Sequence, residues 1–385
     1  MKRQSGSFHK TIAGGERVKA FVPRPLPPSN PPLRITNRTE ELHREAAAAL
    51  DRLAIAGAMV PNSDWFLYGF VRKEAVISSQ IEGTQATLQD VLEFEATDKT
   101  EIPDDVEEVC NYVDALAWAR RELAKPKGLP ISTRLLCEAH KRLMRGARGK
   151  SRAPGEIRRS QNWIGGTRPG NARFVPPPPD KVPPAMSALE KWLNSSDLLP
   201  PIIRTGLAHA QFETIHPFLD GNGRIGRLLI TLLLEQWGVL TTPALYLSLA
   251  LKRRQQEYYN GLHATRTKGD WEGWIDFYLA CVREAADDGV SVSRRLFTLV
   301  GEDRKRLLAS DATTIPALRL FDLLPTHPMM TLPKAIKLLK TTKPTASKAL
   351  SLLRAANVLK ETTGKARDRV YAYHAYLRAL TQDAD

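Results

Sequence analysis

Apolar residues recur at helical spacing through most of the central part of the chain. Positions three and four residues apart form one face of a helix, so a run of this kind predicts a packed helix. The segments with this pattern are residues 40–55, 65–94, 106–123, 132–145, 181–192, 202–215, 224–237, 251–265 and 271–295. No internal repeat is visible, and the pattern predicts a mainly α-helical bundle.

One segment breaks the helical pattern. Residues 158–179 contain Gly, Pro and Asn between two short β-prone pieces, residues 162–164 and 173–175. Turn-forming residues between two such pieces are typical of a β-hairpin. We therefore predict one small hairpin in the bundle.

The two ends of the chain differ from the bundle. Residues 1–35 are rich in Pro, Arg and Ser and predict an extended, polyproline-like arm. Near the C-terminus, three short helical segments at 317–324, 332–339 and 344–355 precede a segment of alternating polarity, an order that predicts a winged helix. In its third helix Thr345, Ser347 and Lys348 would face outward, and the basic residues of the wing are Lys360, Lys365, Arg367 and Arg369.

Length and composition fit this organisation. A chain of 385 residues with 42% hydrophobic residues is long enough for two or three packed domains. The predicted parts are a Pro-rich arm over residues 1–35, a helical region over 36–125, a core domain over 126–295 and a winged-helix domain over 310–385.

Charge and cysteine content indicate which partners and which cellular compartment to expect. There are 56 Lys and Arg against 42 Asp and Glu, a surplus that favours polyanions as partners, although a solvated basic surface explains it equally well. Cys110, Cys137 and Cys281 lie far apart and form no CxxC pair, so neither a disulfide framework nor a zinc site is expected. No apolar stretch is long enough to span a membrane, and we expect a cytoplasmic protein.

The loop HPFLDGNGRIGR, residues 216–227, joins two apolar helices and contains the residue types that phosphate binding requires. Gly221 and Gly223 permit close approach of backbone N–H groups to an anion. The next helix adds the positive end of its dipole at the same place. Arg224 and Arg227, three residues apart, are expected to share a helix face and to bind more than one phosphate.

Two further side chains of the loop suit group transfer. Asp220 offers hard oxygen ligands for Mg²⁺ beside the predicted phosphate site. His216 can accept a proton near neutral pH. A polar turn with a hydrogen-bonded His and a capping Asp is the simpler alternative, but Gly, Asp, His and Arg are rarely combined in one loop for that purpose.

This loop matches the signature HPFx(D/E)GNGRxxR at every fixed position, so the chain resembles the Fic family. The segments GEIRRSQNWIGG, YLSLALKRRQQEYYNGL and GDWEGWIDFYL extend the resemblance over most of residues 15–290. The resemblance implies a Fic-type helical bundle with a β-hairpin flap, and a C-terminal winged helix-turn-helix domain is a frequent companion.

The resemblance also implies a reaction. Most Fic proteins are protein adenylyltransferases, which transfer AMP from ATP to a Ser, Thr or Tyr hydroxyl of a target protein. Carried over by position, His216 is the general base, Asp220 holds Mg²⁺, and Arg227 reaches the γ-phosphate. The other phosphate-binding positions implied are Gly221, Asn222, Gly223 and Arg224.

A second motif predicts regulation. Residues 78–83, SSQIEG, fit the family's inhibitory motif (S/T)xxxE(G/N). Ser78 and Glu82 are four apart and share a helix face, and Gly83 would let another backbone approach. Glu82 would then pair with Arg227 in the place of the γ-phosphate, whereas a surface Glu near a helix end is the plain alternative.

The resemblance assigns two more groups of residues. Tyr258, Tyr259 and Asn260 are expected around the adenine, although core packing explains one tyrosine equally well. The flap that binds the target by strand addition would contain Ile164, Gly165, Gly166 and Phe174, and its alternative is a plain surface hairpin.

The leading hypothesis is an adenylyltransferase autoinhibited by Glu82, with ATP and Mg²⁺ as substrate and cofactor. A nucleotide-sensing transcription regulator with the Fic fold is one alternative, and a de-AMPylase or another phosphate-group transferase is a second. The expected partners are a target protein, which includes the chain itself, and DNA or protein at the winged helix. A homodimer is left open, because no residue of the sequence identifies an interface.

Overall fold

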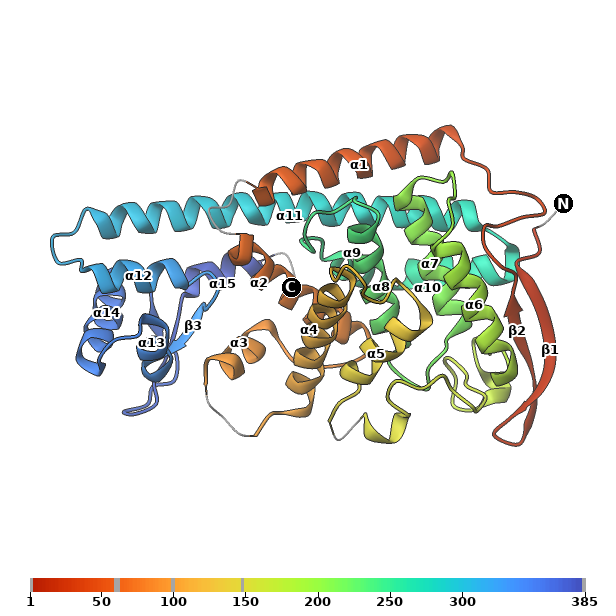
Figure 1. Cartoon of the computed structure of the whole chain (residues 1–385), viewed down its shortest axis with the longest axis horizontal. Helices are drawn as coiled ribbons and strands as arrows, with labels where there is room; N and C mark the ends of the chain where they lie inside the picture. The colour runs from red at the N-terminus through yellow and green to blue at the C-terminus, as the bar shows by residue number, and fades with distance from the viewer. Residues whose placement is uncertain (1–2, 59–62, 98–100, 147–148, 383–385) are drawn as a thin grey trace.

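The computed structural model describes residues 3–58, 63–97, 101–146 and 149–382. Two long helices, α1 (Asn37–Ala58) and α11 (Trp271–Leu308), run side by side along one edge of the protein (Figure 1). Small buried residues on α1, Ala46 and Ala49, allow the two helices to approach closely. At Gly289 of α11 an added Cβ would lie only 2.8 Å from Leu53 of α1.

The remaining helices pack below this pair (Figure 1). Their bounds are α2 Ser63–Ile81, α3 Leu88–Ala96, α4 Asp104–Leu123, α5 Thr133–Leu143, α6 Val182–Leu193, α7 Pro201–Ile215, α8 Asn222–Gln236, α9 Leu247–Arg253 and α10 Gln255–Lys268. Short 3₁₀ turns occupy Lys150–Arg152, Pro169–Asn171 and Pro179–Lys181. α7 and α8 lie at the centre, and almost every residue of both is buried, so the segment that joins them is fixed at both ends. The predicted mainly helical fold is confirmed.

The predicted N-terminal arm is wrong in its first part. Residues 6–23 form an antiparallel hairpin of β1 (Gly6–Ala13) and β2 (Glu16–Pro23). The turn is Gly14-Gly15, and both glycines have positive φ, which two-residue hairpin turns require. Buried Val18 and Ala20 of β2 pack with Val175, so the hairpin lies on the body of the protein rather than extending from it.

Several helix bounds also differ from the prediction. The segment 65–94 is two helices, because α2 ends at Ile81 before Gly83 (φ 101°), and α3 begins after a capping box of Thr87 and Asp90. The segment 251–265 is likewise divided into α9 and α10, and α11 continues past residue 295 to Leu308.

The predicted flap hairpin pairs at one position. Ile164 and Phe174 exchange two backbone hydrogen bonds, of 2.8 and 3.1 Å. The turn between them contains Gly165 and Gly166, both with positive φ, where other residues would be strained.

The C-terminal unit comprises α12 (Ile315–Leu323), β3 (Met329–Thr331), α13 (Leu332–Leu339), α14 (Lys343–Ala355), β4 (Lys360–Glu361), β5 (Val370–Ala372) and α15 (His374–Thr381). Its antiparallel sheet has the order β3-β5-β4. The three helices and the two last strands follow the predicted order, and the assignment as a winged helix stays a prediction. One cluster of buried apolar residues runs from α1 to α15, so this unit shares its core with the rest of the protein.

None of the described helices is both long and apolar enough to cross a membrane. Within the described ranges the three cysteines are free thiols.

Candidate active site

The loop between α7 and α8 is held in shape by its own side chains. α7 ends at His216, whose backbone is left-handed (φ 51°), and Gly221 (φ 72°) precedes α8. The Asn222 side chain accepts a hydrogen bond from the Phe218 N–H (2.8 Å) and donates one to the Phe218 carbonyl (2.9 Å). The Phe218 ring stacks on His140, with 3.9 Å between ring centroids. The loop is therefore a fixed turn that leads into the N-terminus of α8.

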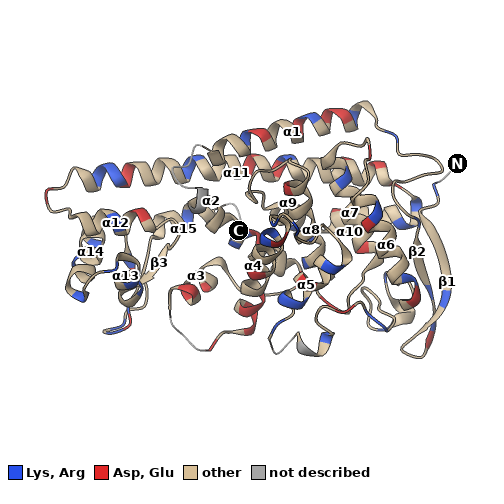
Figure 2. Cartoon of the chain, in the orientation of Figure 1, with Lys and Arg blue, Asp and Glu red and all other residues tan. Residues whose placement is uncertain are grey.

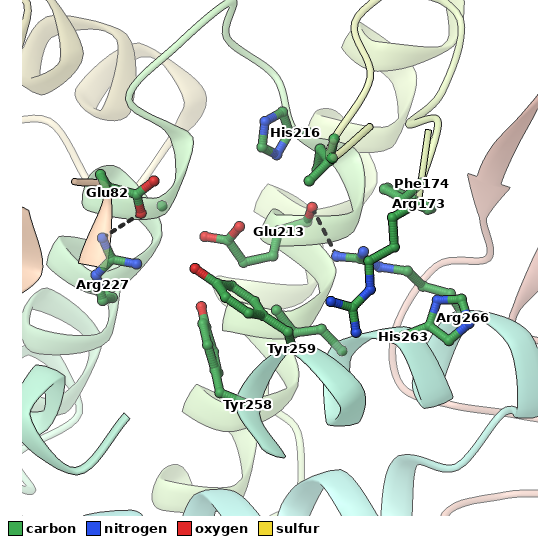
Figure 3. A pocket seen from close by; sticks show the side chains of 14 residues that line it. Glu82, Arg173, Phe174, Glu213, His216, Arg227, Tyr258, Tyr259, His263 and Arg266 are labelled. Atoms are coloured by element: carbon green, nitrogen blue, oxygen red, sulfur yellow. Dashed lines mark hydrogen bonds and ion pairs between the residues drawn. The ribbon is translucent and has the colours of Figure 1, made fainter. Parts of the chain in front are cut away.

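A cavity of about 260 Å³ opens beside this turn (Figure 3). Its walls come from the end of α2, the flap, α7, α8 and α10. The lining residues are Glu82, Ile164, Gly165, Arg173, Phe174, Glu213, His216, Gly223, Arg227, Tyr258, Tyr259, Leu262, His263 and Arg266. Cationic side chains outnumber carboxylates in this lining, as expected of a site for a polyanion.

The N-terminus of α8 faces this cavity. Gly221 caps the helix without a side-chain hydrogen bond in the described structure, so the first amides of α8 have neither a helical nor a capping partner. Gly223 allows the Glu82 carboxylate to lie close to this end, since an added Cβ would lie 2.1 Å from Oε1 of Glu82. Backbone amides at a helix N-terminus form an anion site.

His216 is held at the mouth of this anion site by its main chain. Its carbonyl accepts a hydrogen bond from Nε of the buried Arg158 (2.9 Å). Burial, together with the positive charges of Arg266 and Arg158, lowers the pKa of His216 to about 3. The imidazole is therefore neutral at physiological pH, the form that accepts a proton, and a bound polyanion would raise its pKa and make it a stronger base.

The predicted contact between Glu82 and Arg227 is formed. Arg227 donates from Nε to Oγ of Ser78 (2.8 Å) and from Nη2 to the Ser78 carbonyl (2.8 Å). Its Nη2 also donates to Oε1 of Glu82 (2.7 Å), the contact drawn as a dashed line in Figure 3. The Arg227 side chain is 2% exposed and that of Glu82 is 37% exposed. Burial acts to lower the pKa of Arg227, but the Glu82 carboxylate outweighs it and holds this pKa above its usual value. A buried cation thus has one partly exposed carboxylate as its partner.

Asp220 projects from the other side of the turn. It is half exposed; one carboxylate oxygen accepts from the Gly221 N–H (2.6 Å), and the other lies 3.9 Å from Nε of Arg152. Among the residues that the structure describes, no three His, Cys, Asp or Glu side chains are grouped to hold a metal ion. A cation at Asp220 would therefore take most of its oxygen ligands from substrate phosphates and water, which is how proteins usually hold Mg²⁺.

The sequence is similar to known proteins over the region that forms this site. Residues 40–121 match the N-terminal region of the Fic/DOC family and residues 130–234 match the Fic/DOC family itself. The chain therefore contains a Fic/DOC N-terminal region and a Fic/DOC domain. A Protein adenylyltransferase Fic from Drosophila grimshawi is 30% identical over 212 residues, which are 54% of this chain and 40% of that protein. The relative of the same name from Drosophila melanogaster is 33% identical over 135 residues, 34% of this chain and 25% of its own length. The chain thus spans less than half the length of these relatives.

Solved Fic structures share the fold. A Fic family protein from Desulfovibrio desulfuricans G20 superposes with a TM-score of 0.57 at 22% identity, over 89% of this chain and 98% of that one. A Fic domain containing signaling protein from Bacteroides thetaiotaomicron superposes with a TM-score of 0.51 at 18% identity, over 67% of this chain and 97% of that one. The predicted Fic-type fold is confirmed.

Two assignments within the Fic loop need correction. Arg224 does not line the cavity that Arg227 lines; its buried guanidinium forms an ion pair with Glu108 of α4 (3.1 Å). The side-chain oxygen and nitrogen of Asn222 both form hydrogen bonds with the Phe218 backbone, so this side chain stabilises the loop instead of facing a phosphate. Only the backbone N–H of Asn222 remains at the predicted anion site.

The reason given for Gly83 also needs correction. Its φ of 101° is unfavourable for other residues, but an added Cβ would meet nothing within 4 Å. Gly83 is needed for the turn that ends α2, and not for the approach of another backbone.

The residues predicted around the adenine divide into two groups. Tyr258 and Tyr259 line the cavity, and the buried Tyr258 also hydrogen-bonds to Nε2 of His209 (2.9 Å), so it belongs to the core as well. Asn260 does not line the cavity; its Oδ1 accepts from Arg173 of the flap (2.8 Å) and from Gln256 (2.9 Å).

Three of the four flap residues reach the cavity. Ile164, Gly165 and Phe174 line it and Gly166 does not. The guanidinium of Arg266 lies 3.9 Å from the centre of the Phe174 ring, a cation–π contact that ties the flap to α10.

Several cavity residues escaped the sequence analysis. Glu213 lies one helical turn before His216, and that spacing was the available signal. Burial raises the pKa of Glu213 to about 7 against the opposing charge of Arg227. Arg266 donates to the Glu213 carbonyl (3.2 Å), and with His263 and Leu262 it continues the α10 face that begins at the tyrosines.

Proposed function

We propose that this chain is a protein adenylyltransferase, which transfers AMP from ATP to a Ser, Thr or Tyr hydroxyl of a target protein. The observation that carries this proposal is one cavity in which a neutral His216, the N-terminus of α8 and Arg227 meet. The named adenylyltransferases that share the Fic region support the choice of AMP.

The binding of ATP follows from the polarity of the cavity. The amides at the start of α8 receive the α- and β-phosphates, and Arg227 receives the γ-phosphate once Glu82 has left it. Tyr258 and Tyr259 on the opposite wall offer aromatic faces to the base. The residues fit Mg²⁺ at Asp220, where the ion would neutralise charge on the phosphates.

The chemical step is an in-line displacement at phosphorus. The oxygen of the target hydroxyl attacks the α-phosphorus, and the bond from that phosphorus to the oxygen bridging to the β-phosphate breaks. Pyrophosphate leaves with the electron pair of that bond, and the hydroxyl proton passes to the neutral imidazole of His216. Positioning and electrostatic stabilisation supply most of the acceleration in such transfers.

Target binding is proposed at the flap. The Ile164–Phe174 bridge presents a short extended backbone beside the cavity, and an extended target segment would add to it as a strand. Glu82 is proposed as an autoinhibitor, because its carboxylate occupies the guanidinium that the γ-phosphate needs.

The experiment is covalent labelling by ATP that carries ³²P at the α-position. The purified chain and candidate targets should gain label with Mg²⁺, and ATP labelled at the γ-position should give none. Label from γ-labelled ATP would instead indicate phosphate transfer, and the absence of label from a Glu82→Gly variant would overturn the proposal.

A second function, DNA binding, is supported by the charge of the C-terminal unit. Residues 312–382 contain 12 Lys and Arg against 3 Asp and Glu, which is 9 of the chain's surplus of 14. Lys343, Lys348 and Arg354 lie on the exposed face of α14, and Figure 2 shows basic residues gathered on α13 and α14. The opposite face of α14 is buried in the unit, as a recognition helix requires. We propose that this face, together with the basic wing residues Lys365, Arg367 and Arg369, binds duplex DNA.

The test is binding of the full chain to a duplex over a series of salt concentrations. Replacing Lys365, Arg367 and Arg369 of the wing with Gln should weaken binding and lower the slope of log K against log salt by about 2.7, at about 0.9 for each lost phosphate contact. The matched control replaces three exposed basic residues far from this unit: Arg17, Lys19 and Lys191. Equal losses of DNA affinity in both variants, or an affinity that does not change with salt concentration, would reject DNA binding as a function.

A further inference from the structure

The inhibitory helix α2 joins two distant parts of the protein. It is a single helix of 19 residues, and about 18 Å of helix separates Gly69 from Ile81. Its last turn holds the active-site Arg227, and its first half lies against the C-terminal unit (Figure 1). A continuous helix is stiff on this scale, so a shift at one end moves the other.

The contact with the C-terminal unit is close. The Tyr376 hydroxyl of α15 donates to the carbonyl of Trp65 (3.4 Å), and the rings of Tyr68 and His327 meet edge to face at 6.1 Å. At Gly69 an added Cβ would lie 2.9 Å from Cδ2 of the fully buried Leu380. The glycine thus allows α15 to lie directly on the backbone of α2.

A second connection runs through α3. Arg72 of α2 forms an ion pair with Glu95 (2.8 Å), and both side chains are mostly buried. Nζ of Lys334 in α13 donates to the Glu95 carbonyl (2.7 Å), and the Thr331 hydroxyl donates to the carbonyl of Ala96 (3.3 Å). The C-terminal unit therefore holds α2 both directly and through α3.

At its other end α2 presents three acceptors to Arg227. Two of them belong to Ser78 and one to Glu82, and the Ser78 carbonyl belongs to the last turn of the helix. The negative end of the helix dipole lies at the same place and favours the guanidinium. All three hydrogen bonds depend on the same axial position of α2, so a small displacement weakens them together.

We propose that the C-terminal unit sets the position of α2 and thereby the strength of the inhibitory contact with Arg227. The unit acts as a regulatory domain for the transferase site, and a ligand that draws it away from α2 relieves inhibition. This inference rests on the proposed function for its activity readout.

The test enlarges the contact at Gly69 in the full chain. Gly69→Val pushes against Leu380, and the double variant Gly69→Val/Leu380→Ala restores the space. Gly301→Val is the matched control, because a Cβ at this helical glycine would meet nothing within 4 Å. Labelling by ATP should rise about 2-fold to 30-fold in Gly69→Val, the range of couplings through packed elements, and return toward the original level in the double variant.

Two further measurements test whether labelling rises because α2 holds Arg227 less tightly. In a Glu82→Gly background Gly69→Val should add nothing, because the carboxylate that competes for Arg227 is already absent; an equal rise there would overturn the proposal. Amide hydrogen exchange of residues 78–84 should become faster in Gly69→Val and not in the control, and unchanged exchange would also overturn it. Faster exchange in a chain that labels nothing would uphold the coupling and reject the adenylyltransferase.

A gentler variant covers the case in which Gly69→Val does not fold. Lys334→Met keeps the aliphatic stem and removes the hydrogen bond to the Glu95 carbonyl. It should increase labelling and exchange in the same direction, and a thermally stable Lys334→Met chain that changes neither quantity counts against the connection through α3 and the proposal.

Discussion

Replacing Glu82 with Gly tests the proposed switch directly. The carboxylate competes with the γ-phosphate for Nη2 of Arg227, at 2.7 Å. Without it Arg227 stays in place, because its two bonds to Ser78, both 2.8 Å, are unchanged. The variant should therefore free the γ-phosphate position without moving the Arg227 guanidinium that would bind this phosphate.

The size of the effect follows from the contact that is lost. A hydrogen bond between charged groups contributes about 1.5–3 kcal/mol, and the partial exposure of Glu82 places this one in the lower half of that range. Because 1.4 kcal/mol corresponds to a factor of ten, about 1.5–2 kcal/mol predicts a rise of about 10-fold to 30-fold in the labelling rate. The gain should appear in turnover more than in ATP affinity, since the tyrosines proposed to contact the base are unaffected.

The assay is the initial rate of covalent label from ATP labelled at the α-position, with ATP affinity measured separately by calorimetry. Glu82→Gln is the matched control: it keeps the size of the side chain and replaces the charged bond with a neutral one, so its rate should lie between that of the original chain and that of Glu82→Gly. If Glu82→Gly labels no faster than the original chain while Arg227→Ala abolishes labelling, Glu82 does not inhibit the enzyme and the reasoning is refuted.

The remaining predictions concern the base, the metal and pH. His216→Ala should lower transfer by about 100-fold to 10,000-fold and leave ATP affinity nearly unchanged, because the phosphate contacts remain; near-normal labelling would refute its role as base. Asp220→Ala should lose the dependence of the rate on Mg²⁺, and an unchanged rate at saturating Mg²⁺ would contradict the metal assignment. Burial, the largest cause in each case, lowers the pKa of His140 to about 4, of His209 to about 3 and of His216 to about 3. In the unfolded chain these groups have a pKa of about 6.5, so between pH 3 and 6.5 the unfolded state binds protons that the folded state does not, and stability should rise with pH. Glu74 and Glu213, with pKa values raised to about 7 chiefly by burial, act in the opposite direction above pH 4.5 and flatten the rise. Urea denaturation at pH 4 and pH 6.5 measures this, and equal or greater stability at pH 4 would contradict it.

The helices and the active loop could be predicted because their signals are local. Apolar periodicity located α4 to α8 to within a few residues, since the buried face of each helix repeats with its turns. The pairing of Glu82 with Arg227 was also predictable, because a short motif indicated which two segments meet. The two bonds from Arg227 to Ser78 were not predicted. The prediction of an extended N-terminal arm was wrong because it relied on the proline content. The Gly14-Gly15 turn and the alternating residues beside it are the local signals of the hairpin.

Only the tertiary structure decided where the arginines and carboxylates of the site point. Spacing alone does not distinguish Arg224 from Arg227, but in the structure Arg224 pairs with Glu108 and Arg227 pairs with Glu82. The presence of Glu213 and Arg266 in the cavity also could not be predicted, because they lie on α7 and α10, two helices that only the fold brings together. The sequence by itself determined the elements and the chemistry of the loop, because those depend on neighbouring residues. The cavity and the contact between α2 and Leu380 form between segments that are distant in the sequence. Which of these segments meet is determined by packing and charge in the folded chain, and not by neighbouring residues.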